Sequence, residues 1–82
     1  MVKGVIRAPK FIQQVKKIDR SYLERIQKII TKIINNLEIG KPMRYNRKGT
    51  RELYLTPLRI SYMYDSKTDV LYFLDIYHKN QQ

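Results

Sequence analysis

The order of the periodic patterns is the feature of this chain that most constrains its fold. Two helical patterns come first, a basic stretch at 40–51 follows, and three short stretches alternate as β-strands do. The longer helical pattern has an apolar residue every three or four positions, at Tyr22, Leu23, Ile26, Ile29, Ile30, Ile33, Ile34 and Leu37. This spacing favours a helix over a strand, in spite of the many isoleucines.

Local signals predict where the helices begin and end. Pro9 suits the first turn of a helix that follows a short strand at Lys3–Ala8, and Asp19-Arg20 makes a break after it. Ser21-Tyr22-Leu23-Glu24 has the form of a capping box, and Gly40 is expected to end the second helix in the left-handed conformation. Two amphipathic helices with a short break between them predict an antiparallel hairpin.

The second half of the chain predicts three antiparallel strands, at Arg51–Leu55, Leu58–Tyr64 and Val70–Tyr77. Thr56-Pro57 and the polar stretch Asp65–Asp69 supply the turns between them. The last strand is apolar on both faces apart from one aspartate, so we expect it at the centre of the sheet. Lys41–Thr50 lacks a sustained period and is expected to be a loop or a sheet edge.

These elements predict an α+β fold in which the helices cover one face of an antiparallel sheet. By alternation, the face under the helices is expected to carry Leu58, Ile60, Tyr62, Tyr72, Leu74 and Ile76. The opposite face is expected to carry Tyr54, Arg59, Ser61, Met63, Phe73, Asp75, Tyr77 and Lys79.

Length and composition exclude several classes of protein. At 82 residues the chain is expected to form one domain, spanning 1–82. There is no cysteine and a single histidine, which argues against a zinc site. The sequence contains no Walker loop, no dinucleotide-binding glycine motif and no carboxylate cluster able to hold Mg²⁺. We therefore expect no metal and no cofactor.

The charge balance indicates the kind of partner. Seventeen basic residues against seven acidic ones give a net charge of +10, which attracts nucleic acid, an anionic membrane or an acidic protein. A solvated, thermophile-like surface is the alternative explanation of such a charge. No apolar run reaches the ~18 residues that a membrane span needs, and the first residues lack the apolar core of a signal peptide. We expect a soluble, cytoplasmic protein with no membrane partner.

Arg59 is the first candidate for chemistry. It alternates with apolar residues in the strand Leu58-Arg59-Ile60-Ser61-Tyr62, and a charge buried between two covered faces would cost several kcal/mol. An open face that binds anions removes this cost. The alternative is an ion pair across the strands with Glu52 or Asp75.

Two further groups of residues are candidates. His78 has the one side chain suited to proton transfer near neutral pH, beside Tyr77 and Lys79, although a single histidine near a terminus is more often simply solvated. The cationic crossing, defined by five basic residues and no acid, is expected to contact RNA phosphates; it comprises Lys41, Arg44, Arg47, Lys48 and Arg51. Tyr45, Tyr54 and Tyr77 are the candidates for stacking on bases, and Tyr54 is expected to contact RNA.

Several of these features together resemble the RelE branch of the RelE/ParE toxin superfamily. The similarity covers nearly the whole chain and includes the helix start Ala8-Pro9-Lys10-Phe11, the break Gly40-Lys41-Pro42 and the strand around Arg59. It ends with Ile76-Tyr77-His78-Lys79, which is similar to the closing motif of the family. The resemblance implies a fold like that of small microbial ribonucleases.

The resemblance also implies a function, a toxin that enters the ribosomal A site and cuts mRNA there without a metal. By matching positions, Arg59 and Lys79 would be catalytic, with His78 and Tyr77 beside them. A cognate acidic RelB-like antitoxin is the implied partner, in a hetero-oligomer. Glu52 and Tyr54 stand where well-studied members have lysines, and the chain ends before their C-terminal tyrosine, so reduced activity is expected.

Two other functions compete with this interpretation. A ParE-like toxin would inhibit gyrase by binding protein and would cut nothing; Arg59 with His78-Lys79 favours the nuclease. A plain RNA-binding module is disfavoured, because two helices followed by three strands fit neither an RRM nor a KH domain.

Overall fold

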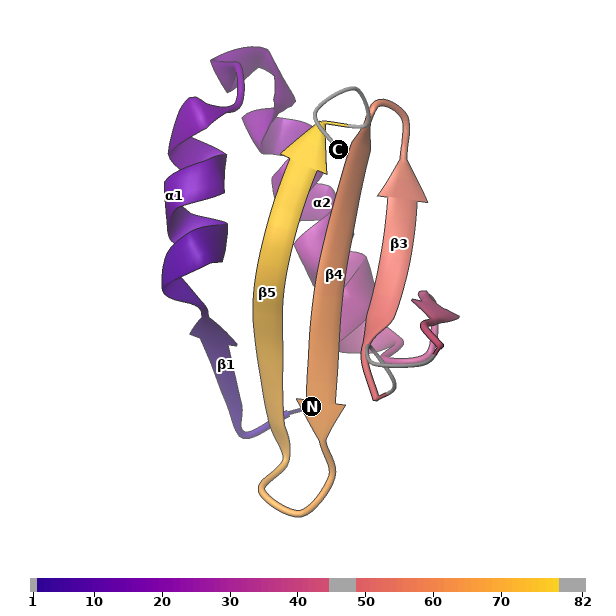
Figure 1. Cartoon of the computed structure of the whole chain (residues 1–82). Helices are drawn as coiled ribbons and strands as arrows, with labels where there is room; N and C mark the ends of the chain where they lie inside the picture. The colour runs from indigo at the N-terminus through magenta and orange to yellow at the C-terminus, as the bar shows by residue number, and fades with distance from the viewer. Residues whose placement is uncertain (1, 45–48, 79–82) are drawn as a thin grey trace.

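A five-stranded sheet forms the frame of the protein, with the strand order β1-β5-β4-β3-β2 (Figure 1). The structure is a computed structural model that describes residues 2–44 and 49–78. Its elements are β1 (Gly4–Arg7), α1 (Pro9–Lys17), a 3-10 turn (Arg20–Tyr22), α2 (Leu23–Asn35), β2 (Lys41–Pro42), β3 (Arg51–Leu55), β4 (Leu58–Asp65) and β5 (Val70–His78). The predicted α+β fold is confirmed. No helix of the described residues is long and apolar enough to cross a membrane.

The sheet is mixed, whereas the sequence predicted an antiparallel one. β1 runs parallel to β5, with Gly4 opposite Val70 and Arg7 opposite Phe73. The other three pairings are antiparallel. β5 has a neighbour on each side, which confirms the central place that its apolar composition predicted.

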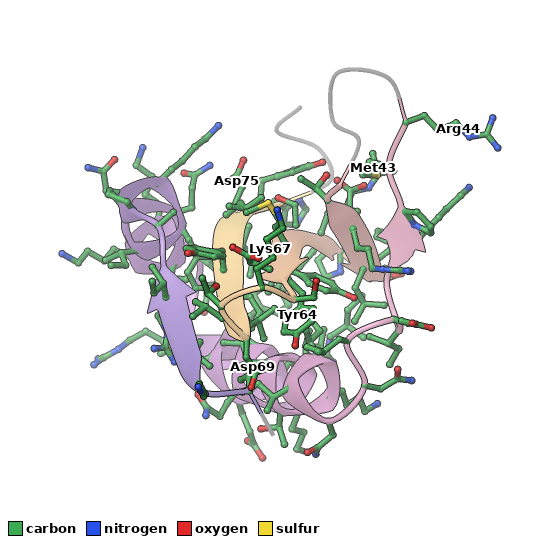
Figure 2. All side chains as sticks on the ribbon, turned by 90° about the horizontal axis from the view of Figure 1, so that it is seen from below. Met43, Arg44, Tyr64, Lys67, Asp69 and Asp75 are labelled. Atoms are coloured by element: carbon green, nitrogen blue, oxygen red, sulfur yellow. The ribbon has the colours of Figure 1, made fainter. Side chains whose placement is uncertain are left out.

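The two helices take different places around the sheet. α2 lies behind the sheet, while α1 lies beside β5 beyond the end of β1 (Figure 1). The ring of Phe11 on α1 stacks on that of Phe73 at 5.5 Å between centroids, and Lys10 pairs with Asp75 at 3.2 Å. Figure 2 shows Tyr64 and Asp69 on the side of α2 and Asp75 on the other side. One face of the sheet is therefore left open, with α1 at its rim.

A β-bulge in β5 changes which of its residues enter the core. Ser61 pairs with Asp75 but Tyr62 pairs with Phe73, so Leu74 is an extra residue on β5. The predicted inward positions of Tyr72 and Leu74 are wrong, as is the outward position of Phe73, which is fully buried. Ile76, beyond the bulge, is buried as predicted. The core consists of Phe11, Ile26, Ile29, Ile30, Ile33, Leu58, Ile60, Tyr62, Leu71, Phe73 and Ile76.

The helix ends also differ from the sequence prediction. The amide of Ser21 donates to Asp19 Oδ1 at 2.8 Å, so Asp19 caps the 3-10 turn and the predicted capping box is not formed. This bond lowers the pKa of the Asp19 carboxyl. α2 ends at Asn35, and positive φ angles occur at Gly49 and Asp69 rather than at Gly40. The predicted left-handed stop at Gly40 is therefore wrong.

Gly40 has a packing role instead. Its amide donates to the hydroxyl of Tyr62 at 2.8 Å, and that hydroxyl donates to the carbonyl of Leu37 at 2.9 Å. Burial raises the pKa of the Tyr62 hydroxyl, which keeps it protonated as a donor. A Cβ atom on Gly40 would lie 2.7 Å from Tyr62 Oη, closer than real contacts allow. The packing of the segment after α2 thus requires a residue without a side chain at position 40.

Replacing Gly40 with alanine is expected to lower the free energy of unfolding by about 1–3 kcal/mol, because the added Cβ atom forces the fully buried Tyr62 ring or the backbone to shift. Gly4→Ala is the matched control, since its Cβ would lie 3.7 Å from Val70 Cγ2, an ordinary contact. Urea unfolding of both variants measures the difference. Equal stabilities of the two would contradict the packing role of Gly40.

Candidate nucleic-acid interface

Three side chains line up across the open face of the sheet. Tyr54 on β3 is directly opposite Arg59 on β4, and Arg59 is directly opposite Tyr77 on β5. Directly opposed residues point to the same face, and here the flanking residues Leu58 and Ile60 are buried on the α2 side. Tyr54, Arg59 and Tyr77 therefore form a row on the face away from α2, as the alternation predicted.

Arg59 packs on an aromatic ring within this row. Its Cζ atom lies 5.3 Å from the centroid of the Tyr54 ring, which is within the range of a cation–π contact. Tyr54 is 45% exposed and the Arg59 side chain is 30% exposed. The guanidinium thus lies over the ring, and both groups contact solvent, an arrangement that suits a base and its phosphate.

Sequence reasoning considered Glu52 as an ion-pair partner of Arg59 but missed its place between Arg59 and Tyr77. Its Oε1 lies 3.5 Å from Arg59 Nη1, and its Oε2 accepts a hydrogen bond from the Tyr77 hydroxyl at 3.0 Å. The ion pair with Glu52 was one of two alternatives for Arg59, while Asp75, the other, pairs with Lys10. The available signal was spacing: Glu52 and Tyr54 are two residues apart and so share a face.

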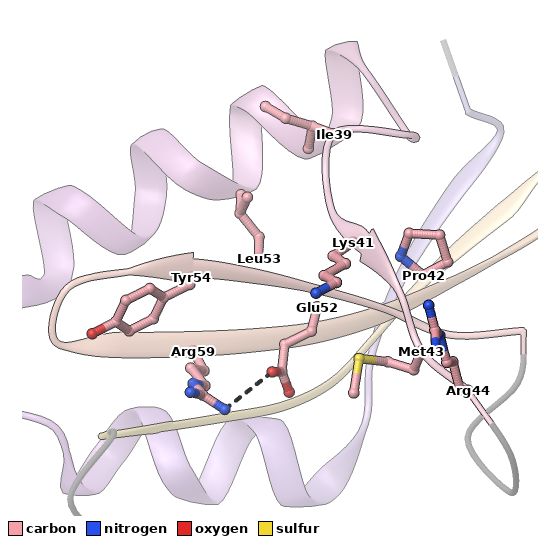
Figure 3. A pocket seen from close by; sticks show the side chains of 9 residues that line it. All are labelled: Ile39, Lys41, Pro42, Met43, Arg44, Glu52, Leu53, Tyr54 and Arg59. Atoms are coloured by element: carbon pink, nitrogen blue, oxygen red, sulfur yellow. Dashed lines mark hydrogen bonds and ion pairs between the residues drawn. The ribbon is translucent and has the colours of Figure 1, made fainter.

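A groove of about 840 Å³ adjoins this cluster (Figure 3). It runs between β2 and the open face, and its lining consists of Ile39, Lys41, Pro42, Met43, Arg44, Glu52, Leu53, Tyr54 and Arg59. Three of these side chains are cationic and one is acidic. β2 is two residues long and pairs with Arg51 and Glu52 at the start of β3.

The cationic crossing is divided by the structure. Lys41 and Arg44 line the groove. Arg51 is paired with Tyr62 and so faces the α2 side, where its Nη1 donates to the carbonyls of Gly40 at 2.7 Å and Glu38 at 3.3 Å. Arg51 therefore holds the segment that follows α2. The remaining two, Arg47 and Lys48, and the stacking candidate Tyr45, lie outside the described residues.

The predicted catalytic residues are not all brought together. Tyr77 joins Arg59 on the open face. His78 is opposite Leu58, a core residue, so the strand places it on the α2 side at the end of β5. Lys79 lies outside the described residues. Within 2–44 and 49–78, no three His, Asp or Glu side chains gather as a metal site would require.

Comparison with known proteins identifies the family. The sequence model of the family described as the ParE toxin of type II toxin–antitoxin systems, parDE, matches residues 5–82. No match was found among curated proteins. The chain therefore belongs to the ParE toxin family, within the RelE/ParE superfamily of toxins.

Solved structures of low sequence identity share the fold. The isolated RelE toxin of E. coli superposes with a TM-score of 0.80 at 10% identity, covering 96% of this chain and 86% of that chain. The toxin–antitoxin complex RelBE2 from Mycobacterium tuberculosis superposes with a TM-score of 0.70 at 19% identity, covering 95% of this chain and 92% of that chain. YafQ from E. coli strain BL21(DE3) superposes with a TM-score of 0.74 at 19% identity, covering 93% of this chain and 92% of that chain. These similarities confirm the RelE-like fold predicted from the sequence.

The division of the cationic crossing predicts different effects for its members. Changing Lys41 and Arg44 together to glutamine should flatten the salt dependence of RNA binding by about 1.4 in log K against log[salt], from ~0.7 per lost contact with a single strand. Arg51→Gln should leave this slope unchanged but reduce stability by about 1–2 kcal/mol, because two carbonyls lose their donor. Fluorescence anisotropy over a salt series, with urea unfolding, measures both. A flattened slope in Arg51→Gln would place Arg51 in the RNA interface.

Proposed function

We propose that this toxin is an endoribonuclease that cuts mRNA in the ribosomal A site. The observation that carries the proposal is the row of Tyr54, Arg59 and Tyr77 on the open face, beside a groove lined by Lys41 and Arg44. A strand in the groove would place a base near the exposed ring and a phosphate near the guanidinium. The resemblance of the sequence to RelE toxins supports the same activity.

The proposed reaction needs no group from outside the chain and its substrate. The ribose 2′-OH attacks the adjacent phosphorus, the bond to the 5′ oxygen breaks, and the products are a cyclic phosphate and a 5′-OH. Negative charge builds up on the phosphorane oxygens, and Arg59 is proposed to stabilise it with its guanidinium donors. Tyr77, which shares the open face with Arg59, is proposed to take part in the proton transfers, and Lys79 follows it two positions later in the sequence.

A second function has a specific observation in its favour. The family model that matches residues 5–82 is that of ParE toxins, and Glu52 partly neutralises Arg59. A toxin that inhibits gyrase by binding it would need no free phosphate site. Gyrase supercoiling assays and primer extension on a translated mRNA, run with the same protein preparation, separate the two functions.

Arg59→Ala is expected to remain folded and to lower the rate of mRNA cleavage by about 10²–10³, the usual cost of losing one preorganised transition-state donor. Arg25→Ala is the matched control. Arg25 also packs on a tyrosine, with its Cζ 5.8 Å from the Tyr22 ring, but it belongs to α2. Primer extension with ribosomes measures the rate. Cleavage at the wild-type rate by a folded Arg59→Ala protein would remove Arg59 from the mechanism.

We also propose an acidic RelB-like antitoxin as the partner, in a hetero-oligomer that lies along the helices and the sheet edge. An apolar groove of about 410 Å³ lies between α1 and α2, rimmed by Arg7 and Lys16. Ile12 and Leu23 line it and are 42% and 41% exposed. An amphipathic segment with acidic flanks would match both the apolar floor and the basic rim.

Ile12→Asp and Leu23→Asp should each weaken antitoxin binding by at least about tenfold, since each removes apolar contact and opposes the acidic partner. Tyr54→Asp is the control. Tyr54 is 45% exposed but belongs to the open face, outside that groove. Co-expression with the neighbouring reading frame, pull-down and calorimetry supply the affinities. If the groove variants bind as the wild type does, the antitoxin occupies another surface.

A further inference from the structure

The carboxylate of Glu52 lies among the donors of the proposed phosphate site. Its two oxygens are shared between Arg59 Nη1 at 3.5 Å and the Tyr77 hydroxyl at 3.0 Å. Lys41 is directly opposite Glu52 on β2, and Figure 3 shows both side chains at the groove together with Arg59. The Glu52 side chain is only 12% exposed. The donors of the proposed phosphate site are thus already in contact with a carboxylate of the protein itself.

The contact between Glu52 and Arg59 is a poor ion pair. Charge-assisted N–H···O bonds between guanidinium and carboxylate are typically about 2.7–2.9 Å long and often bidentate. Here a single nitrogen makes a contact of 3.5 Å. Arg59 Nε is shielded from solvent and has no hydrogen-bond partner among the described residues. Glu52 therefore satisfies only part of the donor capacity of Arg59, and a phosphate could satisfy more of it.

We propose that Glu52 is a built-in competitor of the substrate. In the free protein its carboxylate occupies the position of an RNA phosphate on Arg59 and Tyr77, and RNA binds by displacing it. This inference rests on the proposed function in one respect, that Arg59 binds a phosphate of RNA. Displacement lowers the affinity for any RNA strand, so stable binding requires further contacts that hold the strand in place.

Asp75 is the natural comparison, because it is an acidic residue of the same face with a different partner. It belongs to the same open face, opposite Ser61, but its Oδ2 pairs with Lys10 of α1 at 3.2 Å. Removing either acid adds one positive charge to the protein. Only the removal of Glu52 would free the donors of Arg59 and Tyr77.

The test is binding of a fluorescein-labelled, single-stranded RNA whose 2′-hydroxyls are methylated, so that it cannot be cut. Glu52→Gln is expected to tighten binding roughly tenfold, the effect of about 1.4 kcal/mol. Asp75→Asn is the matched control and should change the dissociation constant by less than about threefold, because the carboxylate of Asp75 pairs with Lys10 rather than with Arg59. Anisotropy titrations at one fixed salt concentration give these constants, and thermal melts show that each variant is folded.

Glu52→Asp provides a second variant that keeps the charge. Its shorter side chain withdraws the carboxylate from Arg59, so binding should tighten without any change in net charge. In an Arg59→Gln background the effect of Glu52→Gln should fall to that of Asp75→Asn, since nothing remains to be freed.

Three results would overturn the inference. The first is that Glu52→Gln and Asp75→Asn change the dissociation constant for RNA equally. The second is that Glu52→Gln still tightens RNA binding in the Arg59→Gln background. The third is unchanged binding with lost mRNA cleavage, which would make Glu52 a group that acts in the reaction. The proposed nuclease activity can fail separately. If the wild type cuts no mRNA while Glu52→Gln still tightens RNA binding through Arg59, the proposal that Glu52 competes with RNA stands and the proposed nuclease activity is wrong.

Discussion

The hydroxyl of Tyr62 is the interaction on which the arrangement of this protein depends. It accepts from the amide of Gly40 and donates to the carbonyl of Leu37, so one buried group satisfies the backbone on both sides of the turn that follows α2. Arg51 adds a donor to the carbonyl of Gly40 from the next strand. Together they fix where β2 begins. Because β2 forms one wall of the groove, the binding surface depends on a hydrogen bond in the core.

Much of the fold could be predicted because its signals are local and periodic. The isoleucine spacing of α2 and the alternation of β4 identified the elements and the buried positions Leu58, Ile60 and Tyr62. The bulge at Leu74 could not be predicted, because β5 is apolar on both faces and either register would bury apolar side chains. Gly40 was assigned to a helix end because the sequence does not show which side chain approaches its α-carbon.

The candidate site was predictable to the extent that it follows alternation. Arg59, Tyr54 and Tyr77 share the open face as expected, because strands place alternate residues on one side. Arg51 also follows alternation, but as a cation in a basic stretch it was grouped with the RNA contacts. Its carbonyl partners, at Glu38 and Gly40, come from another segment and only the folded chain reveals them. The role of Glu52 was hidden in the same way, since its contact with Tyr77 spans 25 positions.

The parallel pairing of β1 with β5 has a consequence for the order of events during synthesis. Gly4 is opposite Val70, so the first strand has no partner until nearly all of the described chain has been made. Closing such a long loop is slow compared with forming a helical hairpin. Arg59 also lacks its neighbour Tyr77 until that point. A growing chain on the ribosome therefore carries its helices but no assembled open face, and that face forms only after β5 has been synthesised.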